Sequence, residues 1–98
     1  MHQLTPNELK KWNNSGKDFL LIDIRETWER ELYQIGGTHI PMGMLFSTID
    51  DLPKDKDVVL YCEKGIRSVI AIQRLEASGF QNLFNLAGGM KAWKESLK

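Results

Sequence analysis

Two short apolar runs constrain the fold of this 98-residue chain most strongly. Residues 19–24 (Phe-Leu-Leu-Ile-Asp-Ile) and 58–61 (Val-Val-Leu-Tyr) are almost continuously apolar, which is typical of strands buried on both faces of a parallel sheet. Residues 83–86 predict another strand, and residues 38–41 predict a short one that ends at Pro41. Helix-like segments alternate with these strands, so the sequence indicates a small α/β fold. We expect residues 1–98 to form a single domain, with helices on both faces of a central, mostly parallel sheet of four to five strands.

The segment that starts at Thr5 carries the strongest helix signals. Thr5 is placed as the N-cap, Pro6 takes the first helical position, and Glu8 can reach back to the cap. His2 precedes this segment in a tail that we expect to be frayed. The helix predicted from Ile66 to about Ser78 has apolar residues around much of its circumference, so we expect it to be substantially buried. Further helices are predicted in residues 25–33, in residues 44–52 and after residues 88–89.

Charge and composition exclude several classes of function. Thirteen basic and thirteen acidic residues balance, and no basic stripe with interleaved aromatic residues is present, so we expect no nucleic-acid partner. The first residues lack a charged and apolar targeting pattern, and no apolar run is long enough to cross a membrane, so we expect a cytoplasmic protein without a membrane partner. One cysteine, two histidines and no clustered carboxylates give a metal site little support. We expect no metal.

The only cysteine follows the second apolar run directly, where the carboxyl end of a parallel strand forms the usual ligand crevice. An ordinary thiol has a pKa of about 8.5, so a reactive cysteine needs groups that stabilise its thiolate. The start of the next helix, loop amides around Gly65, and the cations Lys64 and Arg67 are available, whereas Glu63 opposes them unless it points outward. Cys62 is therefore a candidate nucleophile. The alternative is an inert cysteine that fills space like a small apolar residue.

Three segments then resemble one family. The loop Cys62-Glu63-Lys64-Gly65-Ile66-Arg67-Ser68 is similar to the active-site loop of rhodanese-like sulfurtransferases, whose pattern is Cys-x-x-Gly-x-Arg, often followed by Ser. Residues 21–26 (Leu-Ile-Asp-Ile-Arg-Glu) resemble the family's Asp-Val-Arg-Glu strand end. Residues 85–93 resemble its C-terminal Gly-Gly-x-x-x-Trp segment. The resemblance covers nearly the whole chain and implies a rhodanese-like fold.

The resemblance also implies the transfer of a sulfane sulfur. Cys62 would take the sulfur from a thiosulfate-like donor or a protein persulfide, hold it as a persulfide, and pass it to a thiol or to cyanide without any cofactor. Backbone amides from Glu63 to Ser68 would hold the terminal sulfur, while Lys64 and Arg67 would attract anionic donors. The binding loop is thus expected to comprise Glu63, Lys64, Gly65, Ile66, Arg67 and Ser68.

Asp23 and Arg25 lie at the neighbouring strand end, and the resemblance implies that they support the loop without touching the substrate. The alternative for these two residues is a surface ion pair of little energetic consequence. His39 does not stand where many members of the family carry a histidine. We therefore expect His39 to be a strand residue without a catalytic role.

Two other functions remain open at this stage. The chain can be a sulfur-relay or protein-interaction module, whose partner would be a protein such as a cysteine desulfurase or an activating enzyme. It can also be a cysteine phosphatase or arsenate reductase, but those enzymes place five residues between the cysteine and the arginine, whereas four separate Cys62 from Arg67. The shorter loop favours sulfur over a tetrahedral oxyanion such as phosphate.

Overall fold

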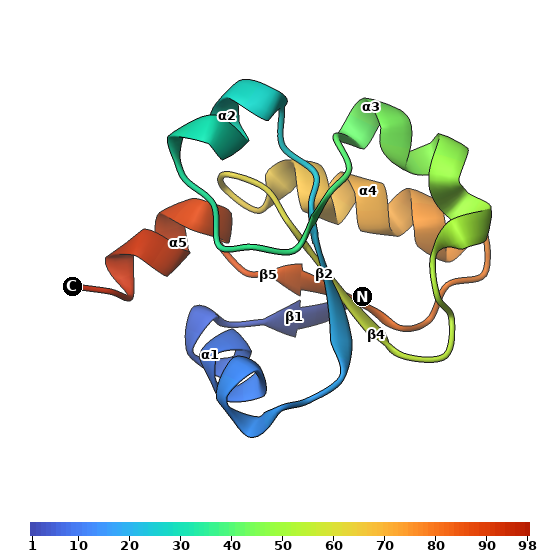
Figure 1. The fold of residues 1–98 in the computed structure, drawn as a ribbon. Helices are drawn as coiled ribbons and strands as arrows, with labels where there is room; N and C mark the ends of the chain where they lie inside the picture. The colour runs from blue at the N-terminus through green and yellow to red at the C-terminus, as the bar shows by residue number, and fades with distance from the viewer.

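A computed structural model describes all residues from Met1 to Lys98 and consists of a five-stranded sheet with helices packed around it (Figure 1). The elements in chain order are β1 (His2–Leu4), α1 (Pro6–Ser15), β2 (Phe19–Asp23), α2 (Thr27–Leu32), β3 (Thr38–His39), α3 (Met42–Leu45), the 3-10 helix η1 (Phe46–Asp51), β4 (Asp57–Tyr61), α4 (Ile66–Ala77), β5 (Leu83–Leu86) and α5 (Gly89–Glu95). The predicted α/β fold with a parallel sheet is confirmed.

The strand order is β1-β5-β4-β2-β3, and every neighbouring pair is parallel. The strand that precedes the cysteine, β4, is central: Leu20 of β2 is in register with Val58, and Phe84 of β5 is in register with Val59. The connection after β4 leads toward the β1 edge, whereas the connection after β2 leads toward the β3 edge. This divergence leaves a crevice beyond the carboxyl ends of β2 and β4, where α/β proteins commonly bind ligands.

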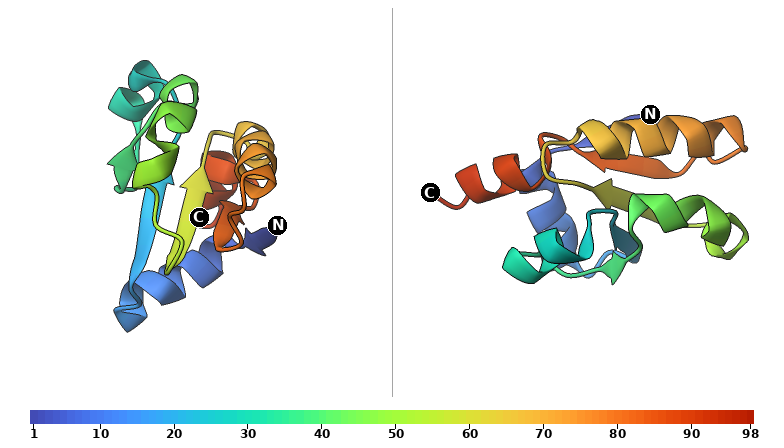
Figure 2. Two further views of the ribbon diagram at one scale, coloured as in Figure 1. Left: turned by 90° about the vertical axis from the view of Figure 1, so that its right-hand side faces the viewer. Right: turned by 90° about the horizontal axis from the view of Figure 1, so that it is seen from above.

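Two hydrophobic cores lie on opposite faces of the sheet, because successive side chains of a strand point to opposite faces. Val58, Leu60 and Cys62 face the core beneath α3 and α4, while Val59 and Tyr61 face the core beneath α1 and α5. In Figure 1, α1 and α5 lie on one side of the sheet and α3 and α4 on the other, and the view from above in Figure 2 shows the same separation. Both strong apolar runs thus pack against a core on two sides, and residues 58–61 are fully buried as their composition predicts, whereas residues 19–21 are only half-buried.

The predicted capping of α1 is confirmed. The Thr5 hydroxyl accepts a hydrogen bond from the Glu8 amide at 3.1 Å, and the Glu8 carboxylate accepts one from the Thr5 amide at 2.9 Å. The expectation of a frayed tail at His2 is wrong. Residues 2–4 pair with β5, and the His2 ring stacks on Phe84 with a centroid distance of 4.7 Å. Ladder hydrogen bonds to β5 hold a segment in which only Leu4 is buried.

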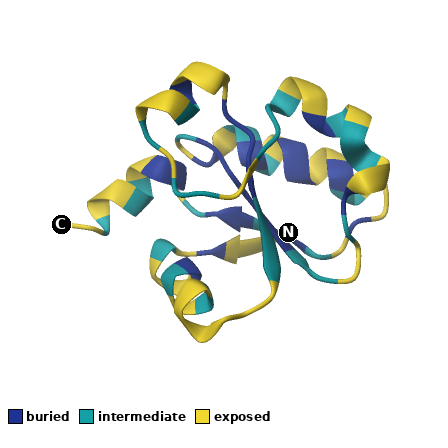
Figure 3. Ribbon diagram, in the orientation of Figure 1, coloured by how far each residue is buried: buried dark blue, intermediate teal, exposed yellow.

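The helix α4 is less buried than its composition predicts. Ala71, Ile72 and Leu75 are fully buried, but Ile66 is 64% exposed and Ile70 is 40% exposed. The sheet and its packed helices cover only one side of α4, and Figure 3 shows burial concentrated in β4, β5 and the inner side of this helix. None of the helices has the length and apolar character that crossing a membrane requires.

Candidate active site

The cysteine lies immediately beyond β4, with 1% of its surface exposed. Gly65 closes the short loop at a φ of +85° and forms the N-cap of α4. This turn directs two backbone amides at the sulfur: the Gly65 N–H donates to Cys62 Sγ at 3.1 Å, and the Ser68 N–H donates at 3.4 Å. The loop therefore surrounds the sulfur with donors that favour negative charge.

The Gly88-Gly89 turn packs directly against the backbone of this loop. The Met90 amide donates to the Cys62 carbonyl at 2.9 Å, and the Lys91 amide donates to the Glu63 carbonyl at 2.9 Å. A Cβ atom at Gly89 would lie 2.4 Å from the Cys62 carbonyl oxygen, and Gly89 has a φ of +60°. The start of α5 thus fixes the path of the chain through Cys62 and Glu63, and only a glycine fits there.

Asp23 and Arg25 form a buried ion pair beside the loop. Arg25 is 1% exposed and Asp23 is 0% exposed, and the Arg25 Nε donates to Asp23 Oδ1 at 2.9 Å. Burial by itself raises the pKa of the Asp23 carboxyl, but hydrogen bonds from Arg25 and its charge outweigh burial and hold that pKa below its ordinary value. The alternative of a surface ion pair is therefore wrong, because the sheet and the following turn enclose both side chains.

This buried pair also reaches the loop. Arg25 Nη1 lies 3.4 Å from Glu63 Oε1, so the carboxylate that opposes a thiolate is turned toward a cation. The ring Nε2 of His39, in β3, donates to the Arg25 carbonyl at 2.7 Å. His39 thus stands as a strand residue that contacts this backbone, as its position in the sequence predicts.

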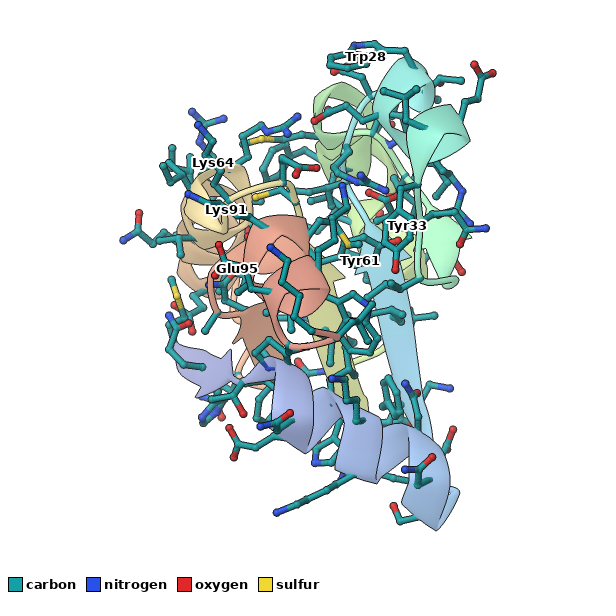
Figure 4. The ribbon with its side chains drawn as sticks, turned by 90° about the vertical axis from the view of Figure 1, so that its left-hand side faces the viewer. Trp28, Tyr33, Tyr61, Lys64, Lys91 and Glu95 are labelled. Atoms are coloured by element: carbon teal, nitrogen blue, oxygen red, sulfur yellow. The ribbon has the colours of Figure 1, made fainter.

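The cation expected to face the donor is paired in the structure. Arg67 donates two hydrogen bonds to Glu29 of α2, at 2.8 Å and 2.7 Å. These bonds, opposed by burial, hold the pKa of Glu29 below its ordinary value. Lys64 is exposed and lies on the outside of the loop, as Figure 4 shows. The sequence analysis does not identify Glu29 as a site residue. The one feature of the sequence that points to it is its position, as an acidic residue in the predicted helix after the strand that ends at Asp23.

A cleft of about 380 Å³ opens over the sulfur. Its walls are formed by Glu29, Cys62, Glu63, Lys64, Ile66 and Arg67. The structure thus brings together the predicted nucleophile and its loop, except that two loop residues do not line the cleft: Gly65 is buried beneath it, and Ser68 lies behind the sulfur with its hydroxyl 3.3 Å from Cys62 Sγ. No group of three or more metal-ligating side chains is gathered in the chain. The arrangement suits attack by a sulfur anion that is held by amides at the bottom of an open cleft.

A comparison with protein families shows the family to which this chain belongs. The model of the rhodanese-like domain family matches residues 5–96. The chain belongs to the rhodanese-like domain family. Two curated relatives and two solved structures illustrate the similarity.

The relatives differ in how much of their length the chain covers. The chain is 36% identical over 98 residues to the probable adenylyltransferase/sulfurtransferase MoeZ of Mycobacterium tuberculosis, covering 97% of the chain but 25% of that protein. It is 38% identical over 78 residues to a sulfurtransferase of Allochromatium vinosum, covering 79% of the chain and 73% of that protein. The chain thus spans only about a quarter of MoeZ.

Two solved structures superpose on nearly the whole chain. A rhodanese-like domain protein of Staphylococcus aureus has a TM-score of 0.86 at 30% identity, covering 95% of this chain and 91% of that chain. A Rhodopseudomonas palustris protein described as a possible tyrosine phosphatase has a TM-score of 0.88 at 29% identity, covering 98% and 81%. The same fold therefore occurs in a protein that is described as a possible phosphatase.

Proposed function

We propose that this chain is a sulfurtransferase that carries a sulfane sulfur on Cys62. The Cys62 thiolate attacks the outer sulfur of the donor, so that a new S–S bond forms while the donor's own bond to that sulfur breaks. The electron pair of the broken bond leaves with the remainder of the donor, which is sulfite when the donor is thiosulfate. An acceptor thiolate or cyanide then removes the outer sulfur and restores the Cys62 thiolate. No cofactor is needed for either half-reaction.

The observation that carries this proposal is the pair of amides directed at Cys62 Sγ from Gly65 and Ser68. Donors fixed around an anion stabilise it without reorganisation when charge develops. The turn has four residues between Cys62 and Arg67, one fewer than the phosphatase loop, which favours a sulfur atom over a phosphate group. The names of the relatives from A. vinosum and M. tuberculosis support the same general activity.

The second candidate is a sulfur-relay module that receives its sulfur from another protein. It is favoured by the similarity to MoeZ, whose name combines an adenylyltransferase with a sulfurtransferase. Partners of this kind would be a cysteine desulfurase or an activating enzyme, and the persulfide on Cys62 would be the same. Rapid loading by a desulfurase, with no loading by thiosulfate, would favour the relay over the thiosulfate enzyme.

Incubation with thiosulfate is expected to add one sulfur atom to the protein. Intact-mass spectrometry before and after incubation measures the gain, and treatment with cyanide should remove it. Cys62→Ala should gain nothing, because the nucleophile is absent. The proposal fails if no sulfane donor, including a loaded desulfurase, forms the adduct. Hydrolysis of an aryl phosphate that disappears in Cys62→Ser would instead support the phosphatase activity suggested for the R. palustris protein.

Removing the positive charge of Arg67 and removing the negative charge of Glu29 are expected to move the KM for thiosulfate in opposite directions. Arg67→Ala removes a cation from the cleft wall and should raise KM by about fivefold, which corresponds to about 1 kcal/mol for one charge in a wet cleft. Glu29→Gln removes the anion that pairs with Arg67 and should lower KM. Steady-state cyanide assays measure both values. Loss of folded structure in Arg67→Ala, seen by circular dichroism, would contradict a role confined to the donor.

A further inference from the structure

A chain of hydrogen bonds leads from the sulfur through the buried residues Ser68 and Asn85 to exposed Gln3 of β1, on the side away from the cleft. The Ser68 hydroxyl, fully buried, lies 3.3 Å from Cys62 Sγ and donates to Asn85 Oδ1 of β5. Asn85 is 3% exposed, and its Nδ2 donates to Gln3 Oε1 at 3.0 Å. An asparagine is an unusual residue for the interior of a strand whose neighbours Phe84 and Leu86 pack in a core. No part of the sulfur-transfer steps above uses it.

With Asn85 Oδ1 turned toward Ser68, as in this structure, the hydrogen bonds can be satisfied in only one direction. A serine hydroxyl has one proton, and Ser68 gives it to Asn85. The bond between Ser68 and Cys62 must then be donated by the S–H group of the cysteine. This orientation of the Asn85 amide therefore matches a protonated thiol. A thiolate or persulfide anion has no such proton, so it would face a lone pair of the Ser68 oxygen.

The chain can reverse without any change in volume. If the Asn85 amide turns over, its Nδ2 donates to the Ser68 oxygen and leaves the Ser68 proton free to bond the sulfur anion. Asn85 Oδ1 then faces Gln3, whose own amide can turn to present Nε2. Gln3 is exposed, so its rotation meets little resistance. An ionised aspartate or a leucine at position 85 could not take part in both directions.

We propose that Asn85 is a positioning residue that acts on Cys62 through Ser68, by turning its amide to match the charge on the sulfur. It acts from β5, on the side opposite the charged groups that line the cleft. Those groups are Glu29 of α2, Glu63 and Lys64 of the loop, and Arg67 of α4. Substitution of Asn85 leaves all of them in place.

Substitutions at Asn85 are expected to move the pH profile of thiol alkylation in opposite directions. An ionised Asn85→Asp side chain can only accept, so it keeps the Ser68 proton from the sulfur, and its negative charge disfavours the thiolate as well; the midpoint should move up by about one pH unit or more. That shift is about a tenfold slower alkylation at a pH below both midpoints. Asn85→Leu leaves the sulfur as the only acceptor for Ser68 and should move the midpoint down. The rate of reaction with iodoacetamide, followed by intact mass, gives each profile.

A Ser68→Ala background separates an effect of Asn85 that passes through Ser68 from a direct effect of Asn85 on Cys62. With no hydroxyl to redirect, Asn85→Leu should leave the midpoint where Ser68→Ala alone places it. The proposal is overturned if the two Asn85 variants move the midpoint in the same direction. It is also overturned if the effect of leucine is absent in the natural background or persists without Ser68.

Nuclear magnetic resonance tests the same inference on the unaltered protein, whatever the stability of the variants. The Asn85 side-chain amide protons should contact Gln3 below the midpoint of the alkylation profile and the Ser68 β-protons above it. Unchanged neighbours on both sides of the midpoint would overturn the proposal. The inference rests on the proposed function, because both require Cys62 to react as a thiolate anion. Alkylation needs no sulfur donor, so a failure of the proposed role of Asn85 is distinguishable from a failure of sulfur transfer.

Discussion

Asp23→Asn is expected to destabilise the fold by about 3–5 kcal/mol, the usual effect of removing one partner from a buried ion pair. The substitution keeps the shape of the side chain but leaves the Arg25 guanidinium buried without its main counter-charge. Arg25 also donates to the Tyr33 carbonyl at 2.6 Å and lies 3.4 Å from Glu63. Those contacts orient the guanidinium, but neither offers a buried carboxylate. Urea unfolding at neutral pH measures the loss.

A surface aspartate provides the matched control. Asp18 pairs with Lys56 at 3.4 Å, and its side chain is 84% exposed. Asp18→Asn removes the same charge from an ion pair in water, so it should change the free energy of unfolding by less than about 1 kcal/mol. Similar losses from Asp18→Asn and Asp23→Asn would contradict the importance of burial. Replacing Asp23 and Arg25 together by leucine and methionine should recover much of the stability, because no buried charge is then left alone.

The contribution of Asp23 should disappear in acid. Its pKa in the folded chain lies below the ordinary value, which for an unfolded aspartate is about 3.9. The ionised form is therefore favoured by folding, and its stabilisation is fully present above that unfolded pKa. The stabilisation is lost as the pH falls through the folded pKa. The difference in unfolding free energy between the natural chain and Asp23→Asn should thus be constant near neutral pH and shrink below about pH 4.

Local signals in the sequence were sufficient for most of the fold. The apolar runs predicted β2 and β4 because both pack against a core on two sides, and the Thr5 cap with Glu8 predicted the start of α1. The position of Cys62 after β4 predicted the loop, since a parallel strand leads directly into the next helix. In each case the decisive contacts are made within a few residues or follow from the strand pattern itself.

Contacts between distant segments could not be predicted in the same way. The pairing of Glu29 with Arg67 joins residues 38 positions apart, and that of Ser68 with Asn85 spans 17. A charged residue after a strand gives no sign of whether other segments will enclose it, so the sequence does not predict the burial of Arg25. β1 was missed because three residues with one apolar side chain become a strand only when the edge of β5 is already present. A polar residue inside an apolar strand, such as Asn85, indicates that its side chain has a hydrogen-bond partner elsewhere in the chain.

Gly89→Ala is expected to slow the loading of Cys62 with sulfur by on the order of 10–100-fold, because a displacement of about 1 Å at a reacting group has effects of this size. The new Cβ atom would lie 2.4 Å from the Cys62 carbonyl oxygen and 2.7 Å from the Glu63 carbonyl carbon. Both are backbone atoms, so no side chain can rotate away to make room. The loop must shift, and with it the amides that are directed at the sulfur. The rate of adduct formation with thiosulfate, followed by intact mass, measures the effect.

Gly16→Ala separates this displacement from the general penalty for a side chain at positive φ. Gly16 ends α1 at a φ of +71°, close to the +60° of Gly89, but a Cβ atom there would have no neighbour within 4 Å. Gly16→Ala should reduce stability by about 1–2 kcal/mol, which is the effect of the left-handed conformation on a residue with a side chain, and Gly89→Ala should add to this penalty the cost of displacing the backbone of the loop. Only Gly89→Ala should slow sulfur loading while the protein is still folded. Equal loading rates in the two variants would mean that the Gly88-Gly89 turn does not determine the geometry at Cys62, and that the loop maintains its amides without support from α5.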